Sequence, residues 1–126
     1  MTNKCYAVNT SEIVPEIEID NGIFAQVIIP KDEHGMGMHK VRMLPNAKYK
    51  PHTHPIPHYL IVTRGSGWTT YNDNEDKIIL SSGALIYIAE DVVHQVGAGE
   101  DDMEILVISH NSPELEDPSR MVFQKK

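Results

Sequence analysis

Cysteine and long apolar runs are both scarce in this sequence. The chain has one cysteine, Cys5, so it cannot form an internal disulfide, and such cysteine usage favours a reducing compartment. No run of about 18 apolar residues occurs, which argues against a transmembrane helix. The first twenty residues include four acidic ones and no long apolar stretch, unlike a signal peptide. We therefore expect a cytoplasmic protein in which Cys5 is an incidental residue and not a nucleophile.

A shortage of basic residues excludes two classes of partner. Eleven Lys and Arg residues stand against 18 Asp and Glu, and the formal net charge is -7. Nucleic acids and anionic membranes are bound through basic patches, and the one basic cluster here is Lys125-Lys126 at the end of the chain. The sequence thus predicts that neither a nucleic acid nor a membrane is a partner.

Helical periodicity is missing as well. No segment of helical length shows an apolar period of 3.6 residues, whereas short β-branched runs bounded by Gly, Pro, Asn and Asp recur about every ten residues. These runs predict eight or nine strands, at 23–29, 38–44, 49–54, 58–63, 68–71, 77–80, 84–88, 93–96 and 103–109. The pattern is typical of one all-β domain, an antiparallel sandwich or barrel. We expect this domain at 22–110, with an N-terminal arm at 1–21 and a C-terminal tail at 111–126.

Histidine, by contrast, is concentrated. Three of the seven histidines, His52, His54 and His58, fall within the stretch PHTHPIPH at 51–58. Alternate side chains of an extended strand share a face, so His52 and His54 point to the same side, and His58 has the same parity although two prolines bend the path. Three imidazoles aimed into one space indicate a metal site. Two other interpretations stay open: a chance cluster in a surface loop, and a purely structural metal clip.

The stretch from Asn46 to Gly65 resembles the first conserved motif of the cupins. That motif reads glycine, five residues, His-x-His, three or four residues, a carboxylate, six residues, glycine. His52 and His54 match the histidine pair, His58 takes the place of the usual glutamate, and Asn46 replaces the opening glycine. Asparagine, like glycine, reaches left-handed backbone conformations, so this replacement is compatible with the motif.

The second cupin motif is matched in part. It reads glycine, five residues, Pro-x-Gly, two residues, His, three residues, Asn. Gly83 and His94 stand at the right spacing, while the proline, glycine and asparagine are replaced by Ala89, Asp91 and Ala98. The two motifs together, in register, are more specific than either alone.

The resemblance covers residues from about 22 to 110 and implies a double-stranded β-helix, a jelly-roll barrel with a divalent transition metal inside. Carried over position by position, it implies four metal ligands, His52, His54, His58 and His94. The chain is similar to small single-domain cupins, of cupin type 2, that carry histidine in place of the glutamate. Their likeness favours Mn(II) or Fe(II), with Zn, Ni or Cu as alternatives, and implies a homodimer, because small cupins usually pair through their sheets.

The neutral ligand at His58 leaves the +2 charge of such an ion uncompensated, which favours anionic ligands such as carboxylates and enolates. We therefore expect a metal-dependent enzyme for a small anionic organic substrate, with a dioxygenase-type oxidoreductase as the first hypothesis. The alternatives are a non-redox isomerase, lyase or cyclase, and a non-catalytic protein that binds a small molecule such as a sugar. Lys40 and Arg42 are the cationic residues that could pair with an anionic substrate, although a solvated sheet face is the simpler expectation for both.

Structural roles are expected for the remaining candidates. His34 and His110 should lie at the surface. His39 lies on a strand that lines the barrel in the cupins, so the resemblance implies that it could contact a substrate or a metal ligand. Trp68 and Tyr71 should pack in the core. The sequence identifies no general acid or base.

Overall fold

Nearly all regular secondary structure in the computed structural model is short strands, and the structure describes residues 5, 7–12, 15–29, 32–72, 76–110 and 120–123. A 3-10 turn, η1 (Thr10–Glu12), precedes the strands. The strands are β1 (Ile17–Asp20), β2 (Ile23–Ile29), β3 (Met36–Met43), β4 (His52–Thr53), β5 (His58–Arg64), β6 (Ser66–Tyr71), β7 (Ile78–Ser81), β8 (Leu85–Ile88), β9 (His94–Ala98), β10 (Met103–His110) and β11 (Val122–Phe123). Within the described part of the chain, no helix has the length and apolar character needed to cross a bilayer.

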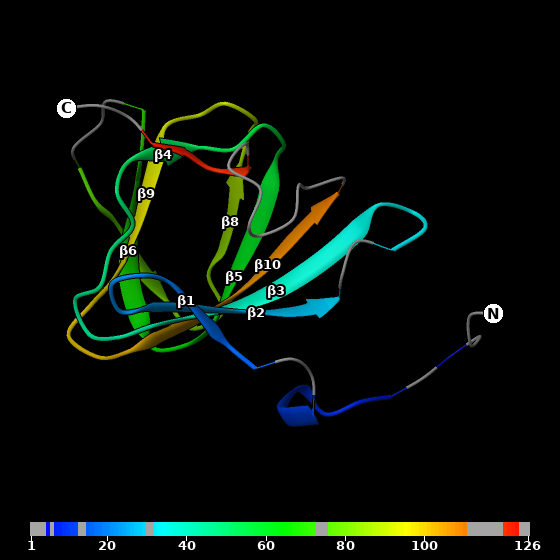
Figure 1. The fold of residues 1–126 in the computed structure, drawn as a ribbon. Coiled ribbons are helices and arrows are strands. Elements are labelled where there is room, and N and C mark those ends of the chain that lie inside the picture. Colours follow the sequence, from blue (N-terminus) through cyan, green and yellow to red (C-terminus); the bar gives the residue numbers. More distant parts are fainter. Residues whose placement is uncertain are drawn as a thin grey trace.

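Two antiparallel sheets face each other (Figure 1). The larger sheet has the order β1-β2-β3-β10-β5-β8 and the smaller has the order β11-β4-β9-β6-β7. Along the chain, β4, β6, β7 and β9 of the smaller sheet are interleaved with β5, β8 and β10 of the larger one. The chain therefore crosses repeatedly from one sheet to the other, and β10 returns to pair with both β3 and β5. This arrangement is a jelly roll, and the all-β barrel expected from the sequence is confirmed.

Alternation along the strands places the core between the two sheets. Buried and half-buried residues alternate along β10, and β5 shows a similar period of two. The inward residues form one cluster whose most deeply buried members are no more than 1% exposed: Ile23, Ala25, Val41, Met43, Val62, Val96, Met103 and Ile105. Burying a large aliphatic side chain fully contributes about 1.5–3 kcal/mol, so this cluster stabilises the scaffold that carries the histidines.

The predicted strand at 49–54 is only partly correct. Only His52–Thr53 forms a strand there, preceded by an isolated bridge between Lys48 and Gly97. Pro51 has no N–H to donate to a ladder, and the carbonyl of Lys50 accepts a hydrogen bond from the His52 ring instead. The pairing with β9 is therefore broken between the bridge and β4.

Strands β1 and β11 lie in the segments that the sequence suggested were an arm and a tail. β1 pairs with β2 at the edge of the larger sheet, and β11 pairs with β4 at the edge of the smaller one. Both are short, which is why neither stands out against the longer β-branched runs. The pairing of β11 brings the C-terminal segment next to the histidines.

The turn positions of the two histidine motifs have left-handed backbone. Gly65 and Gly83 have φ of 81° and 92°, and Asn46 and Asp91, which stand where the motifs have glycine, have φ of 63° and 60°. Asn and Asp tolerate this conformation better than other residues with a side chain. At Gly65 even a Cβ would collide with the carbonyl of Asp102, so this turn requires glycine.

Candidate metal centre

Neighbouring elements of both sheets bring the motif histidines together. His52 lies in β4, His54 immediately follows it, His58 begins β5 and His94 begins β9. His52 and His94 are direct cross-strand partners. In addition, the N–H of Asp91, in the turn before β9, donates to the carbonyl of His54 at 2.8 Å. The two motifs are thus held side by side by backbone pairing.

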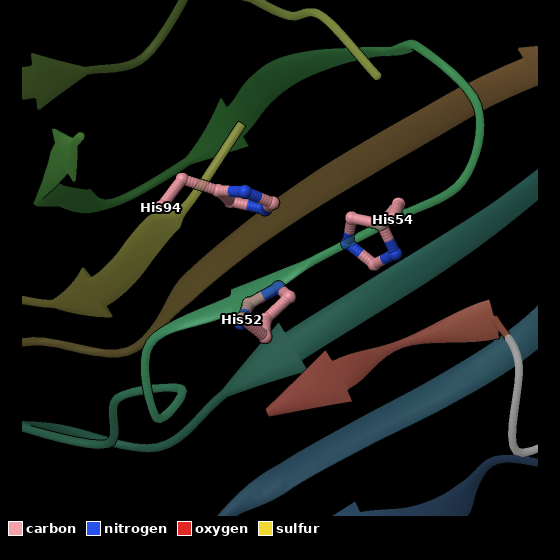
Figure 2. Close-up of side chains that lie close together, drawn as sticks. All are labelled: His52, His54 and His94. Carbon is pink, nitrogen blue, oxygen red and sulfur yellow. The ribbon is translucent and has the colours of Figure 1, made fainter. Parts of the chain in front are cut away.

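Three of the four histidines form a compact group. One ring nitrogen from each of His52, His54 and His94 lies within 4.8 Å of the others, and Figure 2 shows their rings gathered in one space between the strands. Two imidazole nitrogens on one ion, with bonds of about 2.0–2.1 Å, are at most about 4.2 Å apart. A side-chain adjustment of under about 1 Å would therefore let all three reach a common ion.

His58 lies beside this group but outside the 4.8 Å set. Its ring centroid is 4.3 Å from that of His54, and the residue is 2% exposed. Its Nε2 is buried and has no hydrogen-bond partner among the residues that the structure describes. A buried polar atom without a partner costs about 1–3 kcal/mol, so the site has a lone pair that an ion or a ligand would satisfy.

Backbone carbonyls fix the tautomer of all four rings. Nδ1 of each ring lies 2.6–3.0 Å from a carbonyl oxygen, with the pairs His52–Lys50, His54–Arg120, His58–Ile56 and His94–Val92. A carbonyl oxygen accepts only, so Nδ1 carries the proton and donates it, and Nε2 keeps its lone pair. This is the arrangement in which histidine binds a metal through Nε2 while its other nitrogen is anchored.

Burial keeps these rings neutral. It is the main cause that lowers the pKa of His52 to about 3, and the neighbouring His94 lowers it further. Burial together with His58 lowers the pKa of His54 to about 2, and burial together with Arg120 lowers that of His58 to about 4. The pKa of His94 is also lowered by burial. At neutral pH all four are in the uncharged form that a metal requires.

A cavity of about 30 Å³ lies between the four rings. A space of roughly 10–15 Å³ on this measure holds one water, so the cavity can take a few small groups. Its other polar side chains are those of His39, Tyr49 and Arg120, and the rest of its lining is aliphatic or Met. Burial raises the pKa of Tyr49, so its hydroxyl stays protonated. No carboxylate from the described residues lines this space.

The minor candidates from the sequence have mixed outcomes. His34 and His110 are exposed, as expected, and the ring of His110 contacts the carbonyl of His34 at 2.7 Å. His39 is 8% exposed and lines the cavity. Trp68 is half-buried, with the ammonium of Lys77 4.3 Å from its ring. The expectation that Tyr71 packs in the core is wrong, because it ends β6 and is 40% exposed.

The cation at the cavity is one that sequence reasoning missed. Arg42 forms an ion pair with Glu16 at 3.0 Å and stacks on Phe24, away from the cavity, and Lys40 is not in the cavity lining either. Arg120 lines it instead. No local pattern marks Arg120, since it reaches the site only through the pairing of the following strand, β11, with β4.

Comparison with known proteins agrees with the fold and the motif. A family model described as "Cupin domain" matches residues 39–109, more than half of the chain. No curated protein matches the chain. The matched residues include all four motif histidines but not Arg120. A match to this family does not by itself identify a metal.

Solved structures share the same barrel. A cupin-like protein from Thermotoga maritima is 27% identical, with 71% of this chain and 68% of that chain covered and a TM-score of 0.65. The polyketide cyclase RemF from Streptomyces resistomycificus is 19% identical, with 91% and 90% covered and a TM-score of 0.76. An oxalate decarboxylase variant from Bacillus subtilis is 19% identical, with 90% and 31% covered and a TM-score of 0.72. At these identities the last two show the fold alone.

Proposed function

Because the chain belongs to the cupin domain family, we propose that it holds a divalent transition metal through His52, His54, His58 and His94. One observation supports this most strongly: four buried imidazoles, each anchored through Nδ1, surround one cavity, and Nε2 of His58 has no partner in the described part of the chain. Neutral nitrogen ligands suit the divalent ions of the first transition series. Mn(II) or Fe(II) are the proposed occupants, with Zn, Ni or Cu as alternatives.

The proposed activity is that of an oxidoreductase of the dioxygenase type, acting on a small anionic organic substrate. When bound, the ion supplies Lewis acidity and, if it is redox-active, access to dioxygen chemistry. The four neutral imidazoles add no negative charge, so an anionic substrate meets no repulsion from them. The aliphatic wall, which includes Leu60, Val96 and Val107, limits water around the substrate and strengthens the electrostatic interactions inside the site.

A non-redox isomerase, lyase or cyclase is the second candidate. The likeness to the polyketide cyclase extends over nine tenths of both chains, and such chemistry needs only Lewis acidity and an anion site. A non-catalytic small-molecule or sugar carrier would use the same cavity. Oxygen separates the two catalytic candidates: turnover of a substrate that continues at an unchanged rate under strict anaerobic conditions would exclude the dioxygenase, and an absolute need for O2 would exclude the others.

Metal content tests the ligand assignment. Purified protein, loaded with Mn(II) or Zn(II) and dialysed, should carry close to one ion per chain, whereas His54→Ala should lose most of it, because ligand removal costs several kcal/mol of binding free energy. The control is His34→Ala, which removes an exposed histidine outside the cavity and should retain the ion. Full occupancy of His54→Ala, measured by plasma mass spectrometry, would show that these histidines are not the ligands.

A further inference from the structure

Arg120 is a buried cation in the wall of the histidine cavity. The residue is 6% exposed and lines the cavity with the four motif histidines. Its backbone carbonyl accepts the hydrogen bond from Nδ1 of His54 at 2.7 Å, which fixes its main chain next to the site. The guanidinium of arginine stays protonated in proteins, so the cavity holds a positive charge even without a metal.

This charge has no counter-ion among the residues that the structure describes. The other two arginines have one: Arg42 pairs with Glu16 at 3.0 Å and Arg64 pairs with Asp102 at 3.1 Å. Arg120 forms no such pair with a described carboxylate, and none lines the cavity. Burying a charge without a partner costs several kcal/mol, so a compensating anion would be bound tightly.

Among the residues that the structure describes, one side chain forms a hydrogen bond with the guanidinium of Arg120. Nη2 of Arg120 donates to Nε2 of His39 at 2.8 Å, so His39 is an acceptor and neutral, and burial lowers its pKa to about 3. His39 therefore orients the guanidinium without cancelling its charge. A guanidinium has five N–H donors in a planar fork, and this contact uses one of them.

We propose that Arg120 binds the carboxylate of the substrate, so that the site selects small organic anions with a carboxylate at one end and a second donor atom that reaches the histidines. The planar fork of a guanidinium matches a carboxylate in a bidentate manner. A cavity of about 30 Å³ favours a compact anion over a long chain. This inference rests on the proposed function, because it names the substrate class of the same site.

Isothermal titration with malonate tests this role directly. The protein is loaded with Zn(II), which is redox-inert, and titrated with malonate and with its uncharged isostere malonamide. Wild-type protein should bind malonate and prefer it to malonamide. Arg120→Met, which keeps the length of the side chain but not its charge, should weaken malonate binding about ten- to a hundredfold with the zinc content unchanged. Arg120→Lys, which keeps the charge but not the fork, should have an intermediate affinity.

Arg42→Met is the matched control, because it removes an arginine that is paired with Glu16 outside the cavity. It should bind malonate as the wild type does. The proposal is overturned if Arg120→Met has full zinc content and binds malonate within twofold of the wild-type affinity. If Arg120→Met does not fold, the same result for Arg120→Lys overturns it. Wild-type protein that binds zinc but shows no preference for malonate over malonamide would overturn it too.

Titration of the metal-free protein separates this inference from the proposed function. Malonate binding that needs Arg120 but no metal would support the anion site even if the histidines failed to retain any ion. Metal retention by the histidines together with malonate binding that is independent of Arg120 would leave the proposed function intact and exclude this inference.

Discussion

At the scale of single residues, each motif histidine is fixed by one hydrogen bond, but the source of that bond differs. His52, His58 and His94 each use the carbonyl two positions earlier in the chain. These anchors are local, so the sequence around each histidine suffices to form them. His54 instead uses the carbonyl of Arg120, 66 positions away. The orientation of this one ring depends on the C-terminal segment.

The stability of the metal-free protein should depend steeply on acid. Burial is the first cause that lowers the pKa of five histidines, His39, His52, His54, His58 and His94. Below the unfolded pKa of about 6.5, each of these rings takes up a proton in the unfolded chain, whereas in the folded chain His39, His52, His54 and His58 refuse it until about pH 4 or lower. The free energy of unfolding therefore falls as pH falls. This contribution to stability is therefore fully present well above pH 6.5 and is lost progressively as pH falls from about 6.5 to about 4.

Between pH 6.5 and 5 the loss should be on the order of 5 kcal/mol, enough to unfold a domain of ordinary stability. Urea melts of the metal-free protein across this range measure it. His39→Gln, which removes one buried histidine, should make the decrease shallower, whereas His34→Gln should not change it. A midpoint that stays constant from pH 7 to 5 would show that these rings are not buried in the neutral form.

At the scale of elements, β11 completes the site. Val122 and Phe123 pair with Thr53 and His52, and the Phe123 ring centroid is 6.0 Å from that of His52. In Figure 1 this short strand lies beside β4 at one edge of the smaller sheet. The segment from Arg120 thus provides a strand partner, a carbonyl acceptor for His54 and a cation, three contributions that the cupin motifs do not contain.

Ending the chain at residue 119 should weaken metal binding about ten- to a hundredfold, because His54 then loses the acceptor that fixes its tautomer and orientation. Competition with a chromophoric chelator measures the change. Arg120→Met is the informative comparison, since it keeps the backbone carbonyl and should bind the metal almost as tightly as the wild type. Equal affinities for the shortened and the complete chain would mean that His54 is oriented by other contacts.

The same element explains what sequence reasoning could and could not reach. The β-branched runs bounded by turn residues, which became β2, β5 and β10, predict strands. Alternation along a strand predicts that His52 and His54 share a face, and the resemblance to the cupin motifs adds His58 and His94. Arg120 and Tyr49 have no such signal. Their position in the cavity results from pairing between segments far apart in the chain, which neither periodicity nor spacing encodes.

At the scale of the whole molecule, the larger sheet has an apolar outer face. Tyr59 and Tyr87 are cross-strand partners on β5 and β8, their ring centroids are 5.1 Å apart, and they are 49% and 55% exposed. Leu85 is 67% exposed beside them, and Leu106 and Ile108 of β10 continue the same face. A contiguous apolar face of this kind is typical of a protein interface.

We expect two copies of the chain to pair through this face, which is the homodimer that the sequence predicts. Light scattering after gel filtration should then give twice the 14.2 kDa mass of one chain. Tyr59→Lys should shift the protein to monomers, because it would bury an unpaired charge in the interface at a cost of several kcal/mol.

Ile79→Lys is the matched control, since Ile79 is 77% exposed on β7 of the smaller sheet. This variant should leave the dimer intact. Even weak specific dimers assemble at about 100 µM, so wild-type protein that is monomeric at this concentration would exclude this interface. A dimer that is disrupted by Ile79→Lys but not by Tyr59→Lys would place the contact on the other sheet.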